Sequence, residues 1–276
     1  MHKLARRVRF STNPFLSEEF QGSNSFASKP AGEGLAIFLE LSVELAGSVE
    51  PTTGFVVNVT DIDKNVRQFV VPIFAEQIRA DFQQAKHIGL SKLAELLRSA
   101  WGQLADKFGP ARLSKLSWKL NPFREVTMDS QQSNMIYFSE KFEFAATHKL
   151  WNDDFSQQRN FELFGKCANP AGHGHNYVVE VTIKKPIGGG TPPCGNSNNF
   201  CIGDFEKIVD DEFIKLVDHK NLNVDVAEFE KTNPTVENIA AFAWGKLAGK
   251  FGPAVSGALH CVTVWETDRT YCSYYG

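Results

Sequence analysis

Apolar residues recur at helical spacing in two long segments of the chain, and they alternate with polar residues in the segments that flank them. Between residues 93 and 108, and again between 205 and 217, the apolar side chains fall on one face of a helix. Phe142 and Phe144 alternate with charged neighbours as in a half-buried strand, and the β-branched residues 177–183 continue that pattern. Helices segregated from antiparallel strand pairs predict an α+β fold.

The chain also contains an internal repeat. Residues 100–111 (AWGQLADKFGPA) recur 143 positions later as residues 243–254 (AWGKLAGKFGPA). Similarity at a fixed offset indicates a duplicated structural unit, and we expect each copy to read strand, strand, helix, helix, strand, strand. A division at the polar run before residue 131 gives two domains, 1–130 and 131–276.

Turn residues predict where the last helix of each copy begins and ends. In the second copy, Asn233 can cap a helix whose first turn accepts Pro234. The pair Gly252-Pro253 is predicted to end that helix, and Gly109-Pro110 is predicted to end its counterpart in the first copy.

Composition excludes several classes of protein. Hydrophobic residues make up 42% of the 276 residues, which is enough for a buried core. The net charge of -3 gives no footprint for nucleic acid or an anionic membrane, and neither a signal peptide nor a membrane-spanning stretch is recognisable. Five scattered cysteines indicate reduced thiols and a cytoplasmic location. A disulfide between Cys194 and Cys201, which flank a short loop, is the less favoured alternative. The segment 185–199 is rich in Gly, Pro and Asn and is expected to be a loop.

Three histidines are the main candidates for a metal site. His173 and His175 lie two residues apart at the start of a strand, so their side chains project to the same face. His148, at the end of a neighbouring strand, can complete a trigonal set. Three histidines and one open position are typical of catalytic zinc, whereas structural zinc sites use four ligands, mostly cysteine. Each histidine alone would be interpreted as a surface or core residue, but the grouping beside Cys167 favours zinc.

Other polar groups allow more than one interpretation. Cys167 is ranked first as a base, second as an inert thiol and third as a metal ligand. Asp218 and His219 either orient one another or only end the preceding helix, where a histidine suits the helix dipole. Glu266 ends an apolar strand, and it either accepts two parallel N–H bonds from an amidine-like ring or is simply solvated.

Several ordered motifs in the second half resemble those of a known family. They are Phe-Gly-Lys-Cys-x5-His-Gly-His-Asn-Tyr at 164–177 with an upstream Thr-His, then Asp-His-Lys-Asn-Leu, Asn-Pro-Thr-x-Glu-Asn and a late Glu-Thr. Together they resemble the 6-pyruvoyltetrahydropterin synthase family. A bacterial relative, 6-carboxytetrahydropterin synthase of the queuosine pathway, shares most of them. The resemblance covers the chain from about residue 142 to its end.

The resemblance implies the tunnelling fold, in which ββααββ units oligomerise into a β-barrel with the helices outside. It implies that the three histidines bind zinc and that Cys167 works with Asp218 and His219 across a subunit boundary. It implies a pterin substrate, 7,8-dihydroneopterin triphosphate, and a product that has lost triphosphate. It also implies further substrate contacts, which are Glu266 and Thr235 for the pterin ring, with Glu237 beside Thr235. Separately from the resemblance, Lys149, Lys166 and Lys220 are candidates to receive the triphosphate.

Two alternatives to this reaction stay open. Five residues separate Cys167 from His173, as in the branch that forms the pyruvoyl product, but the branch that forms 6-carboxytetrahydropterin shares the substrate and the early proton transfers. The other alternative is a pterin- or purine-binding module without catalysis, in which zinc is structural.

The first copy lacks the groups that the second copy would use. Aligning the two copies by sequence replaces every residue of the site with a different one, and no cysteine precedes Cys167. The replacements are Pro14 near His148, Glu33 and Leu35 at His173 and His175, Ala75 and Glu76 at Asp218 and His219, and Leu120 at Glu266. We therefore predict an inactive unit kept for packing, with a docking surface for a partner enzyme as the alternative.

A site shared between chains constrains the assembly. If Asp218 and His219 come from a neighbour, that neighbour must contribute another second copy. The active copies would then share one ring, and the inactive copies would form their own ring stacked on it. Three chains would form a pseudo-hexamer with three sites, or chains would join in a higher homo-oligomer.

Overall fold

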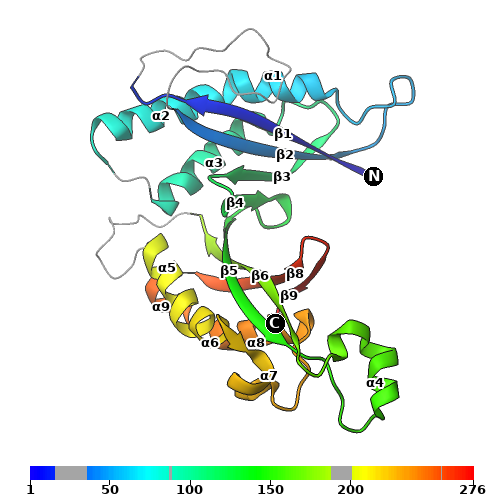
Figure 1. The fold of residues 1–276 in the computed structure, drawn as a ribbon. Coiled ribbons are helices and arrows are strands. Elements are labelled where there is room, and N and C mark those ends of the chain that lie inside the picture. Colours follow the sequence, from blue (N-terminus) through cyan, green and yellow to red (C-terminus); the bar gives the residue numbers. More distant parts are fainter. Residues whose placement is uncertain (16–35, 87–88, 188–200, 256) are drawn as a thin grey trace. The chain divides into compact units, whose positions relative to one another are not determined.

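The computed structural model describes residues 1–15, 36–86, 89–187, 201–255 and 257–276. It divides into two compact units (Figure 1), of which the first comprises Met1–Phe138 and Lys185–Pro193 and the second comprises Ser139–Lys184 and Cys194–Gly276. None of the described helices is long and apolar enough to cross a bilayer. Most of the predicted loop 185–199 lies outside the described residues, and so does Cys194.

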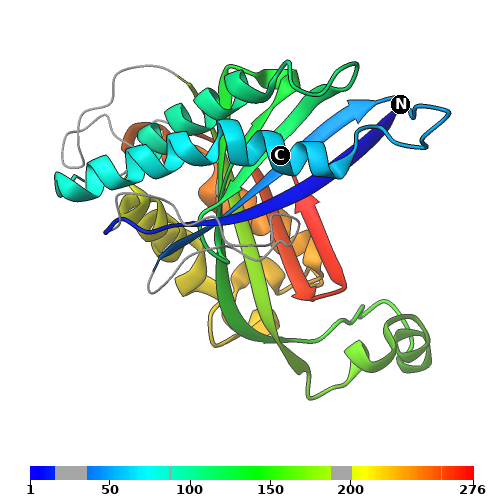
Figure 2. The same cartoon turned by 90° about the horizontal axis from the view of Figure 1, so that it is seen from above.

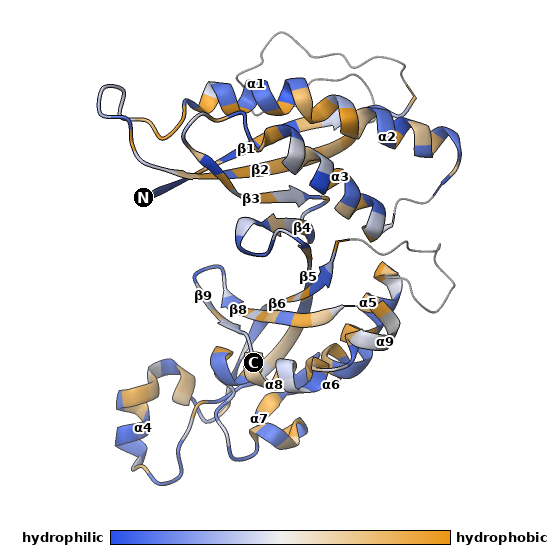
Figure 3. Cartoon of the chain, turned by 180° about the vertical axis from the view of Figure 1, so that it is seen from behind, coloured by the Kyte–Doolittle hydropathy of each residue, from blue (hydrophilic) through white to orange (hydrophobic). Residues whose placement is uncertain are grey.

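The first unit is an antiparallel sheet with helices on one face. Its strands follow the order β1-β2-β3-β4, each antiparallel to the next. Its elements are β1 His2–Thr12, β2 Ile37–Gly47, α1 Val59–Phe69, α2 Val71–Gln83, α3 Leu90–Leu104, β3 Arg112–Lys119 and β4 Arg124–Asp129. Alternate residues of β2, Leu41, Val43 and Leu45, are completely buried. The apolar stripes of the helices cover this face, and Figure 3 shows polar and apolar residues alternating along α1 to α3.

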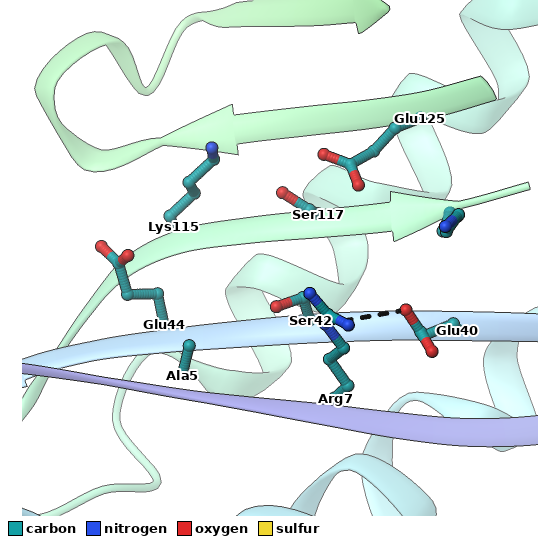
Figure 4. Close-up of a pocket in the computed structure, with 9 residues that line it drawn as sticks. Ala5, Arg7, Glu40, Ser42, Glu44, Lys115, Ser117 and Glu125 are labelled. Carbon is teal, nitrogen blue, oxygen red and sulfur yellow. Dashed lines mark ion pairs between the residues drawn. The ribbon is translucent and has the colours of Figure 1, made fainter. Parts of the chain in front are cut away.

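The opposite face of the first sheet is polar. Figure 4 shows charged and hydroxyl side chains rising from β1, β2, β3 and β4 on this face. Arg9 Nε contacts Glu40 Oε2 at 2.7 Å, Lys3 Nζ contacts Glu44 Oε1 at 2.9 Å, and Ser114 Oγ also lies 2.7 Å from Glu44 Oε1. The strands of this unit are therefore half-buried, as period-two alternation predicts.

The second unit repeats this order with more irregular connections. Its sheet follows the order β5-β6-β8-β9, and the short β7 pairs with β5 in parallel. Figures 1 and 2 show α4 beyond the ends of β5 and β6, away from the other helices of this unit. The elements are β5 Met135–His148, α4 Gln157–Phe164, η2 Gly165–Ala168, β6 His173–Pro186, α5 Ile202–Val209, η3 Asp210–Ile214, α6 Lys215–Val217, β7 Lys220–Asn221, α7 Leu222–Asp225, η4 Ala227–Phe229, α8 Val236–Leu247, α9 Phe251–Val255, β8 Ala258–Thr267 and β9 Thr270–Tyr274.

The apolar helical face predicted between residues 205 and 217 is buried at every fourth residue. Phe205, Val209, Phe213 and Val217 are completely buried, but Leu216 is 38% exposed. A spacing of four drifts around a regular helix of 3.6 residues per turn. The wider π-helical turn η3 lies inside this segment and corrects the drift, so the four side chains stay on the sheet.

The predicted helix ends at the two Gly-Pro pairs are wrong. Helix α8 ends at Leu247, and the chain turns at Gly249, whose φ of 78° suits glycine. Gly252 and Pro253 lie inside α9, near its start, where the first turn of a helix accepts proline. Helix α3 likewise ends at Leu104, several residues before Gly109-Pro110.

Both units share one irregularity of the sheet. The pairing of β2 with β3 shifts register between Glu44 and Leu45, and the pairing of β6 with β8 shifts between Thr182 and Ile183. These two β-bulges are fixed points for comparing the units. Strands β1 and β9 each have a single neighbour among the described strands, and closure into an oligomeric barrel stays a prediction.

Candidate functional site

The structure brings the three predicted histidines together. His148 ends β5, and His173 and His175 begin β6 on the core-facing side of the strand. Nε2 of His148 and Nε2 of His173 are 3.1 Å apart. The centres of the three rings are 4.5 to 5.1 Å apart. Side chains that the sequence separates by 25 residues therefore form one cluster at the ends of two strands.

A hydrogen bond and a close backbone passage fix the position of His148 in this cluster. The backbone carbonyl of Pro234 accepts the Nδ1–H of His148 at 2.8 Å, which leaves the Nε2 lone pair directed into the cluster. Gly172 has φ of 71°, and a Cβ at this position would lie 3.0 Å from the His148 carbonyl oxygen. Glycine is therefore required where the loop before β6 passes the end of β5.

The residues of the cluster fit a metal ion. One ligand atom each from His148, His173, His175 and Glu266 lies within 4.8 Å of the others. Nε2 of His175, which faces the cluster, is buried without a hydrogen-bond partner. Buried, unsatisfied ring nitrogens are costly unless a cation uses their lone pairs, and imidazole nitrogen is a preferred ligand of zinc.

Glu266 lies closer to the histidines than its predicted role as a ring anchor requires. Its Oε1 is 3.4 Å from Nε2 of His148 and 3.3 Å from Nε2 of His175. In β8, Glu266 follows the buried Val262 and Val264 at period two, so it shares their face. That alternation could have predicted the proximity. The carboxylate is available either as a fourth ligand or as an acceptor for a substrate beside the metal.

Sequence reasoning missed Tyr177. This side chain is completely buried, stacks on Phe144 with ring centres 4.9 Å apart, and places its hydroxyl 3.5 Å from Nδ1 of His148. Burial, followed by the charge of Glu266, raises the pKa of Tyr177 far above its ordinary range, so the hydroxyl stays neutral. Its period-two spacing after His173 and His175 was the available signal.

Cys167 lies in the 3₁₀ turn η2, next to this cluster. Its carbonyl accepts the N–H of Leu150 at 2.9 Å. Burial raises the pKa of the half-buried thiol, and the negative charge of Glu266 raises it further. The thiolate that the sequence analysis expected beside a metal is therefore not favoured by the protein groups alone, and it requires a nearby cation.

Asp218 and His219 contact each other, which is one of the two interpretations that the sequence left open. Asp218 Oδ2 is 2.9 Å from Nδ1 of His219, while Asp218 Oδ1 accepts the N–H of Ala145 at 2.9 Å. The Ala145 bond first, and His219 second, hold the pKa of the Asp218 carboxyl below its ordinary value. His219 adopts φ of 55°.

This pair does not join Cys167 within one chain. The His219 side chain is 82% exposed. It lines a hollow of about 440 Å³ together with Thr147, Gly174, His175 and Asn176. Thr147, Gly174 and Asn176 alternate with the three histidines along β5 and β6, but His175 itself also lines the hollow, so the hollow reaches the histidine cluster at this residue.

The remaining candidates lie at the edge of the site. Thr235 caps α8, and its Oγ1 accepts the N–H of Asn238 at 3.4 Å. Glu237 is exposed in the first turn of the same helix. The ammonium of Lys149 lies 5.0 Å from the ring centre of Trp151, and Lys166 and Lys220 are exposed.

The metal-free protein should lose stability as the pH falls below about 6.5, the ordinary pKa of histidine. Burial lowers the pKa of His148, against the opposing Pro234 bond, and burial also lowers the pKa of His175. Below pH 6.5 the unfolded chain therefore binds protons that the folded site does not, so the free energy of unfolding becomes smaller as the pH falls. Thermal unfolding in metal-free buffers measures this decrease. His175→Gln should flatten the curve, and identical slopes for both proteins would contradict the expectation.

Comparisons with known proteins converge on one family. Residues 137–276 match the family model described as 6-pyruvoyl tetrahydropterin synthase. Human 6-pyruvoyl tetrahydrobiopterin synthase is 39% identical over 138 residues, which cover 50% of this chain and 90% of the human protein. The Drosophila melanogaster enzyme is 34% identical over 145 residues, covering 52% and 82% of the two chains. The solved structure of Caenorhabditis elegans 6-pyruvoyl tetrahydropterin synthase is 32% identical, covers 51% of this chain and 96% of its own, and has a TM-score of 0.44.

Proposed function

Because this chain belongs to the 6-pyruvoyl tetrahydropterin synthase family, we propose that residues 131–276 form a zinc-dependent pterin synthase unit. The substrate is 7,8-dihydroneopterin triphosphate, and the product is 6-pyruvoyltetrahydropterin with loss of triphosphate. The main support is the cluster of His148, His173, His175 and Glu266, whose ligand atoms lie within 4.8 Å of one another.

The side chains around this cluster have separate roles in the proposed reaction. Zinc, when bound to the three imidazoles, would supply Lewis-acid activation of the substrate's side-chain hydroxyls. Cys167 removes a carbon-bound proton from that side chain. Glu266 accepts two N–H bonds from the pterin ring, which aligns the reacting carbons beside the histidines.

Asp218 and His219 relay protons to and from the thiol. Asp218 Oδ2, at 2.9 Å from Nδ1 of His219, holds the imidazole in one tautomer, as a carboxylate does in a catalytic triad. We infer that the pair serves the Cys167 of a neighbouring chain, because the His219 side chain is 82% exposed and, among the described residues, has no contact with the Cys167 of its own chain. The assembly is then a ring of second units, formed by three or more chains.

The first unit is proposed as a duplicated copy that has lost the site. Aligning the two β-bulges makes Ile37 correspond to His175, Leu39 to Tyr177 and Leu120 to Glu266. Leu35, which the sequence alignment set at His175, lies outside the described residues. Apolar side chains thus stand at the positions of His175, Tyr177 and Glu266, while the helix-facing core is kept, which supports a packing role.

The full-length protein, loaded with zinc, tests the proposal directly when it is incubated with 7,8-dihydroneopterin triphosphate. Mass spectrometry should detect 6-pyruvoyltetrahydropterin and free triphosphate. A chelator should stop turnover, and added zinc should restore it. Formation of 6-carboxytetrahydropterin would identify the alternative reaction, and tight pterin binding without turnover would identify a binding module.

A further inference from the structure

Asparagine side chains hold the segment that follows His148. Four consecutive backbone N–H groups, those of residues 149–152, each have a specific partner outside the segment. Three of these partners are the side chains of Asn223, Asn233 and Asn160. Segments without regular structure rarely have every backbone donor matched in this way by side chains.

Two of the three asparagines bind both polar groups of one residue. Asn223 Oδ1 accepts the N–H of Lys149 at 2.7 Å, and its Nδ2 donates to the Lys149 carbonyl at 3.0 Å. Asn160 is completely buried. Its Oδ1 accepts the N–H of Asn152 at 2.8 Å, and its Nδ2 donates to the Asn152 carbonyl at 2.9 Å. A carboxamide matches the donor and acceptor of a peptide unit, which no carboxylate can do.

Asn233 connects this segment to the partner of His148. Its Oδ1 accepts the N–H of Trp151 at 2.8 Å. Its backbone carbonyl accepts bonds from Asn238 Nδ2 and from the N–H of Thr235, both at 2.8 Å. The next residue is Pro234, whose carbonyl orients the His148 ring. Asn233 therefore joins the segment after His148 to the turn that fixes its tautomer.

The same segment also reaches Cys167. The fourth donor, the N–H of Leu150, is bonded to the Cys167 carbonyl at 2.9 Å. Residues 149–152 thus lie between the backbone of the thiol and the backbone of the first histidine. A movement of this segment would change the position of both groups.

We propose that Asn160, Asn223 and Asn233 are positioning residues, which fix residues 149–152 so that His148 and Cys167 keep their relative placement at the metal. Hydrogen bonds to groups around a metal ligand are commonly worth 10–100-fold in metal affinity. The inference rests on the proposed zinc site, but its main measurement is metal binding and does not require the proposed reaction.

The test compares zinc affinity, by competition with a chromogenic chelator, for wild type and asparagine variants. Asn223→Ala and Asn233→Ala should each weaken zinc binding by roughly 10–100-fold and alter the absorption spectrum of the cobalt(II)-loaded protein. With zinc saturating, kcat should fall while KM changes little, because the thiol is displaced and the ring anchor is not.

Isosteric variants separate positioning from general stability. Asn233→Asp keeps the only side-chain bond that Asn233 makes here, so its zinc affinity should stay within about threefold of wild type. Asn223→Asp loses its donor and sets a carboxylate against the Lys149 carbonyl, so it should resemble Asn223→Ala. These two variants suffice if an alanine variant does not fold.

Asn58→Ala is the matched control, since Asn58 Oδ1 accepts the N–H of Thr60 at 3.0 Å to cap α1 in the first unit. It should lower Tm without changing zinc affinity. Wild-type zinc affinity and an unchanged cobalt spectrum in Asn223→Asp and both alanine variants would overturn the inference. A wild-type protein that does not bind zinc would instead overturn the proposed function.

Discussion

Replacing Cys167 with alanine should lower kcat by roughly 10²–10⁴-fold, the usual contribution of a general base, while zinc stays bound. The thiol lies in η2, within electrostatic reach of Glu266 and Tyr177, and it is separate from the four clustered ligand atoms. Removing it should therefore remove proton transfer and spare the metal. Steady-state kinetics and zinc content, measured on the same preparation, test both halves of the expectation.

A second cysteine of the same unit provides the control. Cys272 lies in β9, outside the histidine cluster, and Cys272→Ala should keep wild-type turnover. Cys167→Ser should lose nearly as much activity as Cys167→Ala, because a hydroxyl is a far weaker acid than a thiol. If Cys167→Ala instead turns over normally, the thiol is inert and the protein is better described as a binding module. Loss of zinc from the variant would show that the sulfur is a ligand.

Mixing two inactive variants should restore activity. Cys167→Ala keeps Asp218 and His219, and His219→Ala keeps the thiol. If each site takes its thiol from one chain and its imidazole from the next, subunit exchange between equal amounts should create intact sites. Random assembly would make about one quarter of the sites intact, since each site draws its two contributors independently from a closed ring.

The reason for expecting a shared site is geometric. His219 is 82% exposed, and no contact among the described residues joins it to the Cys167 thiol of its own chain. Activity that stays absent after verified exchange would contradict sharing. Sedimentation of the wild type completes the test, because a stable and active monomer would exclude any contribution from a neighbour.

The histidine cluster could be predicted because it depends on short-range geometry. Two histidines at spacing two in a strand must share a face, and a third at the end of the neighbouring strand must lie near them. The proximity of Glu266 depends on the same alternation in β8, but the register between β6 and β8 decides how close it comes. That register includes a bulge at Thr182, which no sequence pattern marked.

Other features could not be predicted because they involve the backbone. The asparagines that hold residues 149–152 bind peptide groups up to 82 positions away, and a peptide group has no sequence signature. The π-helical turn at Asp210 is also invisible in the sequence, although it decides why Val217 is buried and Leu216 is not. The prediction of the helix ends was wrong for a related reason, because proline is accepted both after one helix and in the first turn of the next.

The backbone of His219 has a consequence for how this protein can change. A side chain with a Cβ at φ of 55° is held against a local steric preference that costs about 1 kcal/mol or more. Substitution of His219 by glycine or asparagine would remove this backbone strain and increase stability, but it would also remove the imidazole. In the proposed reaction, selection for the His219 imidazole and selection for thermal stability therefore oppose each other at this one position, and variants freed from the need for that reaction should lose the histidine early.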